Sequence, residues 1–318
     1  MPRILLVKTS SMGDVIHNLP IVSDIRSRYP NADIDWVVEE SFADIPALHP
    51  GVTQVIPVAI RRWRKTLYRA QTWRELRALR ARFSNTVYDF ILDTQGLLKS
   101  ALIARTAQGT RYGLDWASAW EPLGTLLYDR KYTVNPTLHA VARYRALVAQ
   151  ALDLPAGLPL DYGIHAPDLA LHWLPDSPYA VLLHATSRDE KLWPVSHWVE
   201  LGVQLQAQGL VAILPWGDFR EYERAQQLYA QIPGAVLAPR LRLNEAASML
   251  ARAKVVIGVD TGLVHLSSAL AVPTIALYCG SDPAENGLYA QSPIRNLGAP
   301  NNLPTVAETL SAVRALAA

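Results

Sequence analysis

The first candidate for chemistry in the sequence is Asp14, which follows the apolar run Ile4–Val7 after a short polar segment. Gly13 precedes it and permits a tight turn or the close approach of a ligand, and a helical pattern begins at Val15. A carboxylate at such a turn can act as a general base that takes a proton from a substrate hydroxyl. Aspartate and serine are also common helix N-caps, so Asp14 or Ser11 could serve only as a cap. The residues alone leave both interpretations open.

A second polar turn, formed by Asp260, Thr261 and Gly262, follows the apolar run Val255–Val259 and leads into another helical pattern. Backbone amides at the start of a helix bind phosphate groups, and the helix dipole strengthens that binding. His265 follows Thr261 by four residues, so it lies on the same helix face and could reach a phosphate or a ribose. The turn therefore predicts a phosphate site, with a capped structural helix as the alternative.

Two further turns could contribute to the same anion site. Thr186, Ser187 and Lys191 follow the apolar run Tyr179–His184 and supply hydroxyl groups and a cation. Glu221 follows another apolar run and could accept hydrogen bonds from ribose hydroxyls. The sequence has no His-x-x-x-His spacing and no cysteine pair, so we expect no metal site.

These turns need elements that position them, and the chain alternates short apolar runs with helical patterns, as α/β proteins with parallel sheets do. Strands are expected at Ile4–Lys8, Ile34–Val38, Val55–Val58, Val87–Asp93, Tyr179–His184, Leu210–Leu214, Val255–Asp260 and Thr274–Tyr278. Helices are expected at Asp14–Tyr29, Leu67–Arg82, Leu97–Thr106, Val195–Gln208, Phe219–Gln231, Leu243–Ala253 and Gly262–Ala271.

Length and linker composition predict two domains. The chain has 318 residues, about twice the size of a common single domain, and Leu154–Pro178 is rich in proline. We therefore expect doubly wound Rossmann-like domains at residues 1–160 and 161–318, facing a central cleft, with ligands at the carboxyl ends of the strands. Neither a Gly-x-Gly-x-x-Gly fingerprint nor a P-loop occurs after a predicted strand, which disfavours nicotinamide oxidoreductases and P-loop enzymes.

Composition narrows the class of protein further. Half of the residues are hydrophobic and 18% are charged, which excludes a disordered chain. The long uncharged stretch Gly262–Ser281 contains His265 and Pro273 and is an unsuitable membrane span. The apolar run near the N-terminus is too short for a signal peptide, and the single cysteine, Cys279, cannot form an internal disulfide. Both features favour the cytoplasm.

The net charge of +2 conceals an uneven distribution. Residues 1–165 carry 20 basic and 15 acidic side chains, whereas residues 166–318 carry 10 and 13. Arg61–Arg82 alone contains nine basic residues and one acid, a net charge of +8. Such a segment favours an anionic partner, and a solvated amphipathic helix is the alternative.

Together these segments resemble the ADP-heptose:lipopolysaccharide heptosyltransferases of glycosyltransferase family 9, in particular the heptosyltransferase I type. The resemblance covers nearly the whole chain and lies in six blocks: Val7–Asp14, Asp35–Glu40, Val55–Lys65, Asp93–Ser100, Thr186–Pro194, and Asp260–Leu263 with His265. The chain departs from the family pattern at Cys279–Pro283, where relatives tend to read Gly-Pro-Thr-Asp-Pro.

The resemblance implies a GT-B fold in which the final helix, expected at 304–316, packs on the N-terminal domain. It also implies inverting transfer of L-glycero-D-manno-heptose from ADP-heptose to the first Kdo sugar of Kdo2-lipid A, without a cofactor or an obligatory metal. Asp14 matches the family's catalytic base. Donor-binding positions match Thr186, Ser187, Lys191, Glu221, Leu241, Asp260, Thr261, Gly262 and His265. Acceptor-binding positions match Arg61, Arg62 and Lys65.

An acceptor of this kind implies peripheral association with the cytoplasmic face of the inner membrane, where basic residues attract anionic lipid. Trp63 and Trp73 could be interfacial anchors or could simply pack in the fold. Other acceptors further out on the core, or another nucleotide sugar, remain alternatives. A remote alternative is a non-catalytic nucleic-acid-binding protein, although Arg61–Arg82 lacks RNA-binding signatures, so no nucleic acid is expected as a partner.

Overall fold

The computed structural model describes residues 1–155 and 157–317. The chain divides into two compact units, Met1–Ile164 and His165–Ala318. The domain boundary expected after residue 160 lies four residues before this division.

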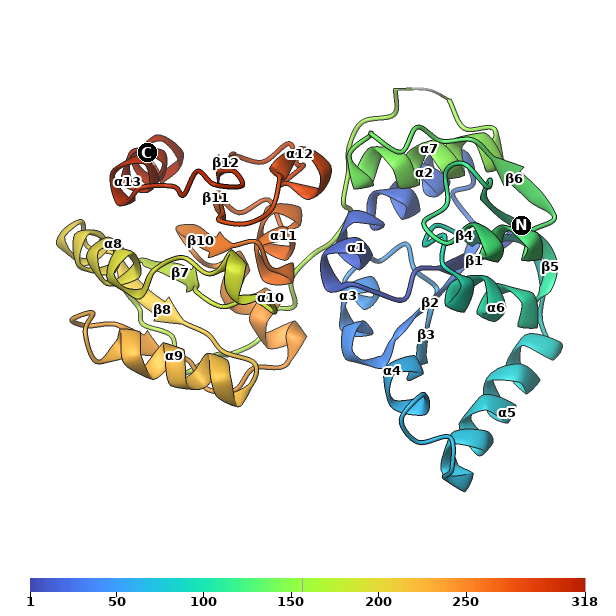
Figure 1. Ribbon diagram of the computed structural model, residues 1–318, viewed down its shortest axis with the longest axis horizontal. Helices are drawn as coiled ribbons and strands as arrows, with labels where there is room; N and C mark the ends of the chain where they lie inside the picture. The colour runs from blue at the N-terminus through green and yellow to red at the C-terminus, as the bar shows by residue number, and fades with distance from the viewer. Residues whose placement is uncertain (156, 318) are drawn as a thin grey trace. The chain divides into compact units, whose positions relative to one another are not determined.

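The first unit contains a parallel six-stranded sheet, which we call sheet A, with the strand order β3-β2-β1-β4-β5-β6 (Figure 1). Its strands are β1 (Arg3–Val7), β2 (Asp33–Glu39), β3 (Gln54–Val58), β4 (Val87–Asp93), β5 (Gln108–Leu114) and β6 (Arg130–Tyr132). Its helical segments are α1 (Met12–His17), α2 (Pro20–Arg28), η1 (Glu40–Phe42), α3 (Asp44–Ala47), α4 (Ile60–Trp63), α5 (Ala70–Ser84), α6 (Leu98–Thr106), η2 (Pro122–Leu127) and α7 (Ala140–Leu152).

The second unit repeats this architecture in sheet B, whose strand order is β12-β11-β10-β7-β8-β9. Its strands are β7 (Tyr179–Leu183), β8 (Val211–Leu214), β9 (Val236–Leu237), β10 (Val255–Val259), β11 (Thr274–Tyr278) and β12 (Ile294–Gly298). Its helical segments are η3 (Asp189–Lys191), α8 (Val195–Ala207), α9 (Phe219–Tyr229), α10 (Leu243–Ala251), α11 (Gly262–Ala269), α12 (Pro283–Asn286) and α13 (Val306–Ala317).

The central strands are buried on both faces because helices cover both sides of each sheet. Every residue of β7, β10 and β11 is buried, which explains why these strands read as continuous apolar runs in the sequence. All eight strands expected from those runs are present, which confirms the α/β fold. The helix expected at Asp14–Tyr29 is instead two helices, because Pro20 begins α2 and its ring cannot continue the preceding helix.

The final helix, α13, packs against the sheet and helices of its own unit. Buried side chains at Val306, Ala312 and Val313 join the hydrophobic core of the second unit, beside residues of α8 and β10. The indole of Trp193 also donates a hydrogen bond to the carbonyl of Pro304, 2.8 Å away, just before this helix. The apolar face of α13 is therefore used within its own unit.

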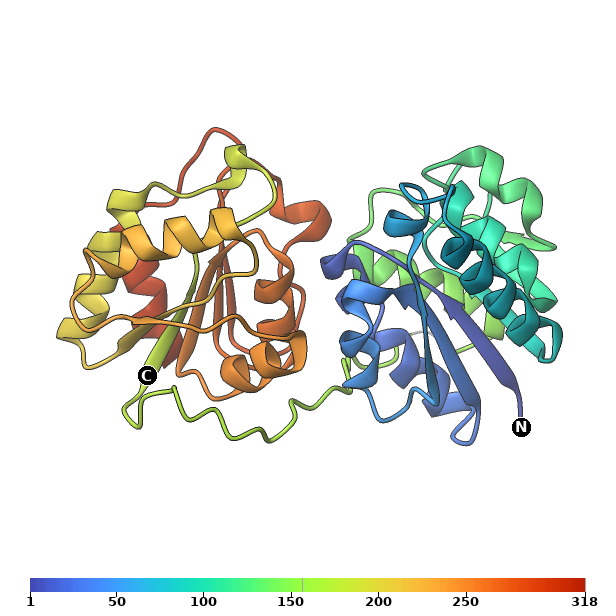
Figure 2. The same ribbon diagram turned by 90° about the horizontal axis from the view of Figure 1, so that it is seen from below.

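Both sheets share the Rossmann order, in which two adjacent central strands lead to helices on opposite sides of the sheet. These neighbours are β1 and β4 in sheet A, and β7 and β10 in sheet B. The crevice beyond the carboxyl ends of such strands is where open α/β sheets bind ligands. In each unit the strands run in one direction, so the loops after them gather at one edge (Figure 2). Among the described residues, no helix is both long enough and apolar enough to cross a membrane.

Candidate active site

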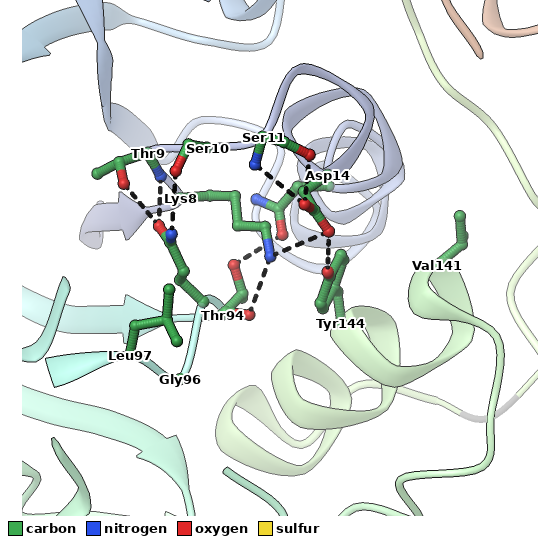
Figure 3. Close-up of polar contacts among 12 residues, drawn as sticks. Lys8, Thr9, Ser10, Ser11, Asp14, Thr94, Gly96, Leu97, Val141 and Tyr144 are labelled. Carbon is green, nitrogen blue, oxygen red and sulfur yellow. Dashed lines mark hydrogen bonds and ion pairs between the residues drawn. The ribbon is translucent and has the colours of Figure 1, made fainter. Parts of the chain in front are cut away.

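Asp14 lies at the crevice of sheet A, in the first turn of α1 beyond the end of β1 (Figure 3). One carboxylate oxygen, Oδ2, accepts hydrogen bonds from the backbone amide of Ser11 at 3.0 Å and from its hydroxyl at 2.7 Å. The other oxygen, Oδ1, accepts a hydrogen bond from the hydroxyl of Tyr144 at 2.6 Å. Ser11 is the N-cap of α1, one of the alternatives that the sequence left open, and its contact with Asp14 leaves Oδ1 to a different partner.

The buried ammonium group of Lys8 provides the nearest positive charge to Asp14. Its Nζ lies 3.9 Å from Oδ1 of Asp14 and 3.7 Å from the centre of the Tyr144 ring, so one cation contacts both groups. It also donates to the carbonyl of Thr94 at 3.5 Å, beyond the end of β4. The side chain of Lys8 is 3% exposed, whereas that of Asp14 is 33% exposed, so the carboxylate is the accessible member of the pair.

These contacts set the protonation of both groups. Burial raises the pKa of Asp14, but the charge of Lys8 and the hydrogen bonds from Tyr144 and Ser11 outweigh burial and hold the pKa well below its usual range. Burial lowers the pKa of Lys8 to about 8, against the opposing effect of Asp14. At neutral pH the site therefore holds an ionised carboxylate, partly open to solvent, that could accept a proton from a hydroxyl group.

The loops after β1 and β4 are tied together around this carboxylate. The side-chain oxygen of Gln95 accepts hydrogen bonds from the amide and the hydroxyl of Thr9, both at 2.7 Å. The ammonium group of Lys99 donates to the hydroxyl of Ser10 at 2.9 Å. Buried Asp93 shapes the β4 turn, because it accepts hydrogen bonds from the amide of Gln95 and the hydroxyl of Tyr128. The turn that carries Asp14 is thus held in place by the loop after the neighbouring strand, β4, and by the start of α6.

The predicted acceptor residues lie beyond the carboxyl end of β3, on and after α4. Arg61 and Lys65 are exposed. Arg62 instead contacts two carboxylates, those of Glu40 at 3.0 Å and Glu75 at 3.1 Å. These two partners raise the pKa of Arg62 and neutralise much of its charge. Arg61 and Lys65 therefore offer more unpaired charge to an anionic ligand than Arg62 does.

The two tryptophans considered as membrane anchors differ in exposure. Trp63 is 9% exposed, packs in the core between sheet A and its helices, and donates its indole N–H to Glu75 at 2.5 Å. It belongs to the packing of the fold and cannot insert into lipid. Trp73 is half exposed on α5.

In the second unit, Asp260 is the centre of a hydrogen-bonded cluster at the crevice of sheet B. Its Oδ2 accepts a hydrogen bond from the ammonium group of Lys191 at 2.5 Å and from the hydroxyl of Ser281 at 2.7 Å. Its Oδ1 lies 3.6 Å from Nε2 of His265, and its backbone carbonyl accepts a hydrogen bond from the hydroxyl of Thr186 at 2.8 Å. Four of the predicted donor residues are thereby brought together.

The carboxylate of Asp260 remains ionised in this cluster. Burial raises its pKa, but hydrogen bonds from His265, Lys191 and Ser281 outweigh that effect and hold the pKa well below its usual range. Thr261, rather than Asp260, is the N-cap of α11, and its side chain makes no capping hydrogen bond. The first amides of this helix have no carbonyl partner within the helix, so they can bind a phosphate at the same edge.

The remaining predicted donor residues lie around this edge and differ in their exposure and in the contacts they make. Glu221, in the first turn of α9, accepts a hydrogen bond from the amide of Gly217 at 2.7 Å and so stabilises its own loop. Gly262 is the first residue of α11. Ser187 is exposed beyond β7, and Leu241 is partly buried before α10.

Several contacts in these sites were not anticipated from the sequence. Arg224 on α9 donates to the carbonyls of His184 at 3.0 Å and Trp193 at 2.5 Å, so it fixes both ends of the loop that carries Lys191. The Ser281 contact lies in the segment that departs from the family pattern. A Cβ atom at Gly280 would lie 2.7 Å from the carbonyl oxygen of Glu190, which explains why this segment needs a glycine beside the Lys191 loop.

Comparisons with known proteins find similarity over most of the chain. A model of glycosyltransferase family 9 (heptosyltransferase) matches residues 76–313. Lipopolysaccharide heptosyltransferase 1 of Pseudomonas aeruginosa is 47% identical over 294 residues, which cover 92% of this chain and 82% of that protein. The structure of E. coli heptosyltransferase WaaC with ADP superposes with a TM-score of 0.90 at 42% identity and covers 98% of this chain and 99% of that one. The complex of WaaC with ADP-2-deoxy-2-fluoro heptose gives a TM-score of 0.88 at the same identity and coverage.

Proposed function

The chain belongs to the heptosyltransferases of glycosyltransferase family 9, which are GT-B enzymes of lipopolysaccharide synthesis, and we propose a specific reaction for it. It transfers L-glycero-D-manno-heptose from ADP-heptose to the first Kdo sugar of Kdo2-lipid A, with inversion at the transferred carbon. The observation that carries this proposal is the pair of hydrogen-bonded carboxylates, Asp14 and Asp260, each in the turn after a central strand of its own sheet.

Asp14 is the general base of this reaction. A sugar hydroxyl is too weak an acid to lose its proton unaided, so the proton moves to Asp14 as the new glycosidic bond forms and the hydroxyl becomes acidic. The low pKa of Asp14 keeps the base ionised before the reaction. Its 33% exposed side chain leaves room for the hydroxyl to approach, in place of one of its present hydrogen-bond partners. Inversion follows when this hydroxyl attacks from the side opposite the departing ADP.

The cluster around Asp260 holds the diphosphate of the donor. Departure of ADP places negative charge on its terminal phosphate, and this charge needs stabilisation in the transition state. Lys191 supplies a cation, and the amides at the start of α11 supply hydrogen-bond donors. Asp260 and Ser281 position the ammonium group and the nearby loop. Thr186, Ser187, Glu221, Leu241, Thr261, Gly262 and His265 complete the donor site in this proposal, which assigns no cofactor or metal a step.

The acceptor is anionic, and the first unit carries the complementary charge. Kdo sugars have carboxylates and lipid A has phosphates, which Arg61, Arg62 and Lys65 are proposed to bind. Because Arg62 is already paired with two acids, Arg61 and Lys65 contribute most of the attraction. A lipid-linked acceptor also requires the enzyme to work at the cytoplasmic surface of the inner membrane, as a peripheral protein.

The test is incubation of the purified protein with ADP-heptose and Kdo2-lipid A, followed by measurement of ADP release and of the mass of the lipid. One heptose added per ADP released is the expected result. Transfer only to a lipid that already carries heptose would assign the enzyme to a later step of core synthesis. ADP release without a change in lipid mass would mean hydrolysis and contradict the proposal.

A further inference from the structure

Large apolar side chains are exposed on the first unit at two neighbouring elements, η2 and the loop before it. Trp116 is 57% exposed, Trp120 64%, Leu123 60% and Leu126 66%. Leu123 and Leu126 stand three residues apart on a 3-10 helix, which places both on one face. Exposed apolar groups gathered in this way mark a surface that binds a membrane or another protein.

The η2 segment is held firmly in this exposed position. The carboxylate of Glu121 accepts a hydrogen bond from the amide of Leu98 at 2.7 Å, at the start of α6. A Cβ atom at Gly124 would lie 3.2 Å from that same amide nitrogen, so η2 packs closely on α6. The guanidinium of buried Arg143 lies over the ring of Trp120, 4.7 Å from its centre, so the indole packs on a buried cation. The apolar side chains are therefore presented to solvent by a well-packed base.

A second cluster of exposed apolar and basic residues lies between α4 and α5. Leu67, Tyr68 and Trp73 are all at least half exposed, and the indole of Trp73 donates to the carbonyl of Leu67 at 2.8 Å. Arg64 and Arg69 are exposed on either side of Leu67 and Tyr68. A hollow of about 180 Å³ in this segment is lined by Arg62, Thr66, Arg69, Gln71 and Thr72. Arg62, Thr66, Gln71 and Thr72 already donate hydrogen bonds within this segment. Arg69 is therefore the lining cation that can bind an anionic headgroup.

Sheet topology places these two clusters on either side of Asp14. The cluster between α4 and α5 follows β3, the Asp14 turn follows β1, and η2 follows β5. In the order β3-β2-β1-β4-β5-β6, β1 lies between β3 and β5, and all three strands are parallel. Their carboxyl ends therefore share one edge of the sheet, as the two views of the first unit show (Figures 1 and 2).

We propose that this edge docks on an anionic lipid bilayer, with Trp116, Trp120, Leu123 and Leu126 entering the interface. Arg64 and Arg69 bind headgroup phosphates at the second cluster. Aromatic and leucine side chains beside arginines are the combination that holds peripheral proteins at the boundary of a membrane. The inference rests on the proposed function, because docking at this edge brings a lipid-linked sugar to Asp14.

The same geometry divides the basic run Arg61–Arg82 into two parts. Helix α5 begins at Ala70 near the carboxyl edge and ends at Ser84, just before β4 starts at the opposite edge. With a rise of about 1.5 Å per residue, Arg80 lies about 15 Å along the helix from Ala70. Only the first part of the run therefore meets the lipid surface, and the charges near Arg80 attract it from a distance.

Flotation with lipid vesicles tests the proposal. Two double variants change the two clusters separately: Leu123→Ser with Leu126→Ser, and Arg64→Gln with Arg69→Gln. We expect the unmodified protein to float with vesicles of phosphatidylcholine and phosphatidylglycerol, and each double variant to bind them about tenfold more weakly. Val87→Ser and Arg105→Gln are matched controls, because both side chains are exposed at the opposite edge of sheet A, and neither should alter flotation.

Turnover separates failure of this inference from failure of the proposed function. On an acceptor stripped of its acyl chains, the Leu123→Ser, Leu126→Ser variant should match the unmodified protein, which also shows that it is folded. On vesicle-embedded acceptor it should lose most of its turnover.

Equal flotation of all proteins, or equal binding to vesicles of phosphatidylcholine alone, would overturn the docking surface. Self-association of the unmodified protein that this variant abolishes would also overturn the docking surface, since the surface would then join two copies of the chain. No turnover by the unmodified protein on either acceptor would overturn the proposed function and leave the flotation result standing.

Discussion

The hydroxyl of Tyr144 donates a hydrogen bond of 2.6 Å to Asp14, a residue 130 positions earlier in the chain. The ring of the same tyrosine lies under the ammonium group of Lys8 at 3.7 Å. One side chain from α7 therefore contacts both the carboxylate and the cation of the candidate active site. This arrangement makes the basicity of Asp14 dependent on a helix that is distant in sequence.

Tyr144→Phe should move the acid limb of the activity profile to higher pH. Loss of the hydroxyl removes one hydrogen bond that stabilises the ionised form of Asp14, so its pKa rises and the base becomes protonated at a higher pH. The measurement is kcat/KM for the acceptor as a function of pH. Tyr132→Phe is the control, because Tyr132 is partly buried on β6 away from this carboxylate. An unchanged acid limb would show that Tyr144 does not control Asp14.

Asp14→Asn should reduce turnover by about 10²–10⁴-fold, the usual contribution of a general base. Binding of ADP-heptose should remain, because the hydrogen bonds of the donor cluster come from other residues. Calorimetry of donor binding beside a turnover assay measures both effects. Asp33→Asn, at an exposed position at the start of β2, is the matched control. Near-normal turnover of the Asp14→Asn protein would remove Asp14 from the role of base.

Lys191→Ala and Ser281→Ala should both weaken binding of ADP-heptose, and their effects should not add. Each side chain donates to the same oxygen of Asp260, so removal of one already disturbs the position of the other. We expect a loss of about tenfold or more for Lys191→Ala, since a charge-assisted contact to phosphate is removed, and a smaller loss for Ser281→Ala. Donor affinity of the two single variants and the double variant gives the coupling. Full additivity would contradict the shared role of Asp260.

Charge reversal at Arg61 should raise the KM for the acceptor more than reversal at Arg62. Arg61 is exposed, whereas Arg62 is held between Glu40 and Glu75 and has less charge to offer. Arg61→Glu should also reduce the dependence of this KM on salt, because an attraction that salt screens has been removed. Steady-state kinetics at two ionic strengths measures both quantities. An effect on the donor KM alone would contradict an acceptor role for Arg61.

The sequence predicted the parts of the fold that depend on local apolar pattern. Continuous apolar runs such as Val255–Val259 predicted the buried strands, and the positions of Asp14 and Asp260 after such runs predicted both turns. The strands β5 and β6 were missed because they lie toward the edge of sheet A, where they contain polar and charged residues. Helix α7 was not predicted either, so the contact from Tyr144 to Asp14 was missed.

Other partners were missed because the chain brings them together only through the fold. Lys8 lies within the block Val7–Asp14, but its burial beside Asp14 depends on α7. Ser281 lies in the segment that departs from the family pattern, and only the sheet order places it beside Asp260. The burial of Trp63 could not be predicted from its sequence neighbours, because they are basic residues while its own ring is buried.

The repeated strand order has a consequence for how such enzymes can diversify. The contacts described for Asp14 come from loops and helices of sheet A, and those described for Asp260 come from loops of sheet B. The contacts that hold each of these carboxylates therefore come from its own unit. If each unit binds one substrate, as proposed, recombination within the proline-rich connection would change the sugar donor and leave the proposed base and its hydrogen bonds intact.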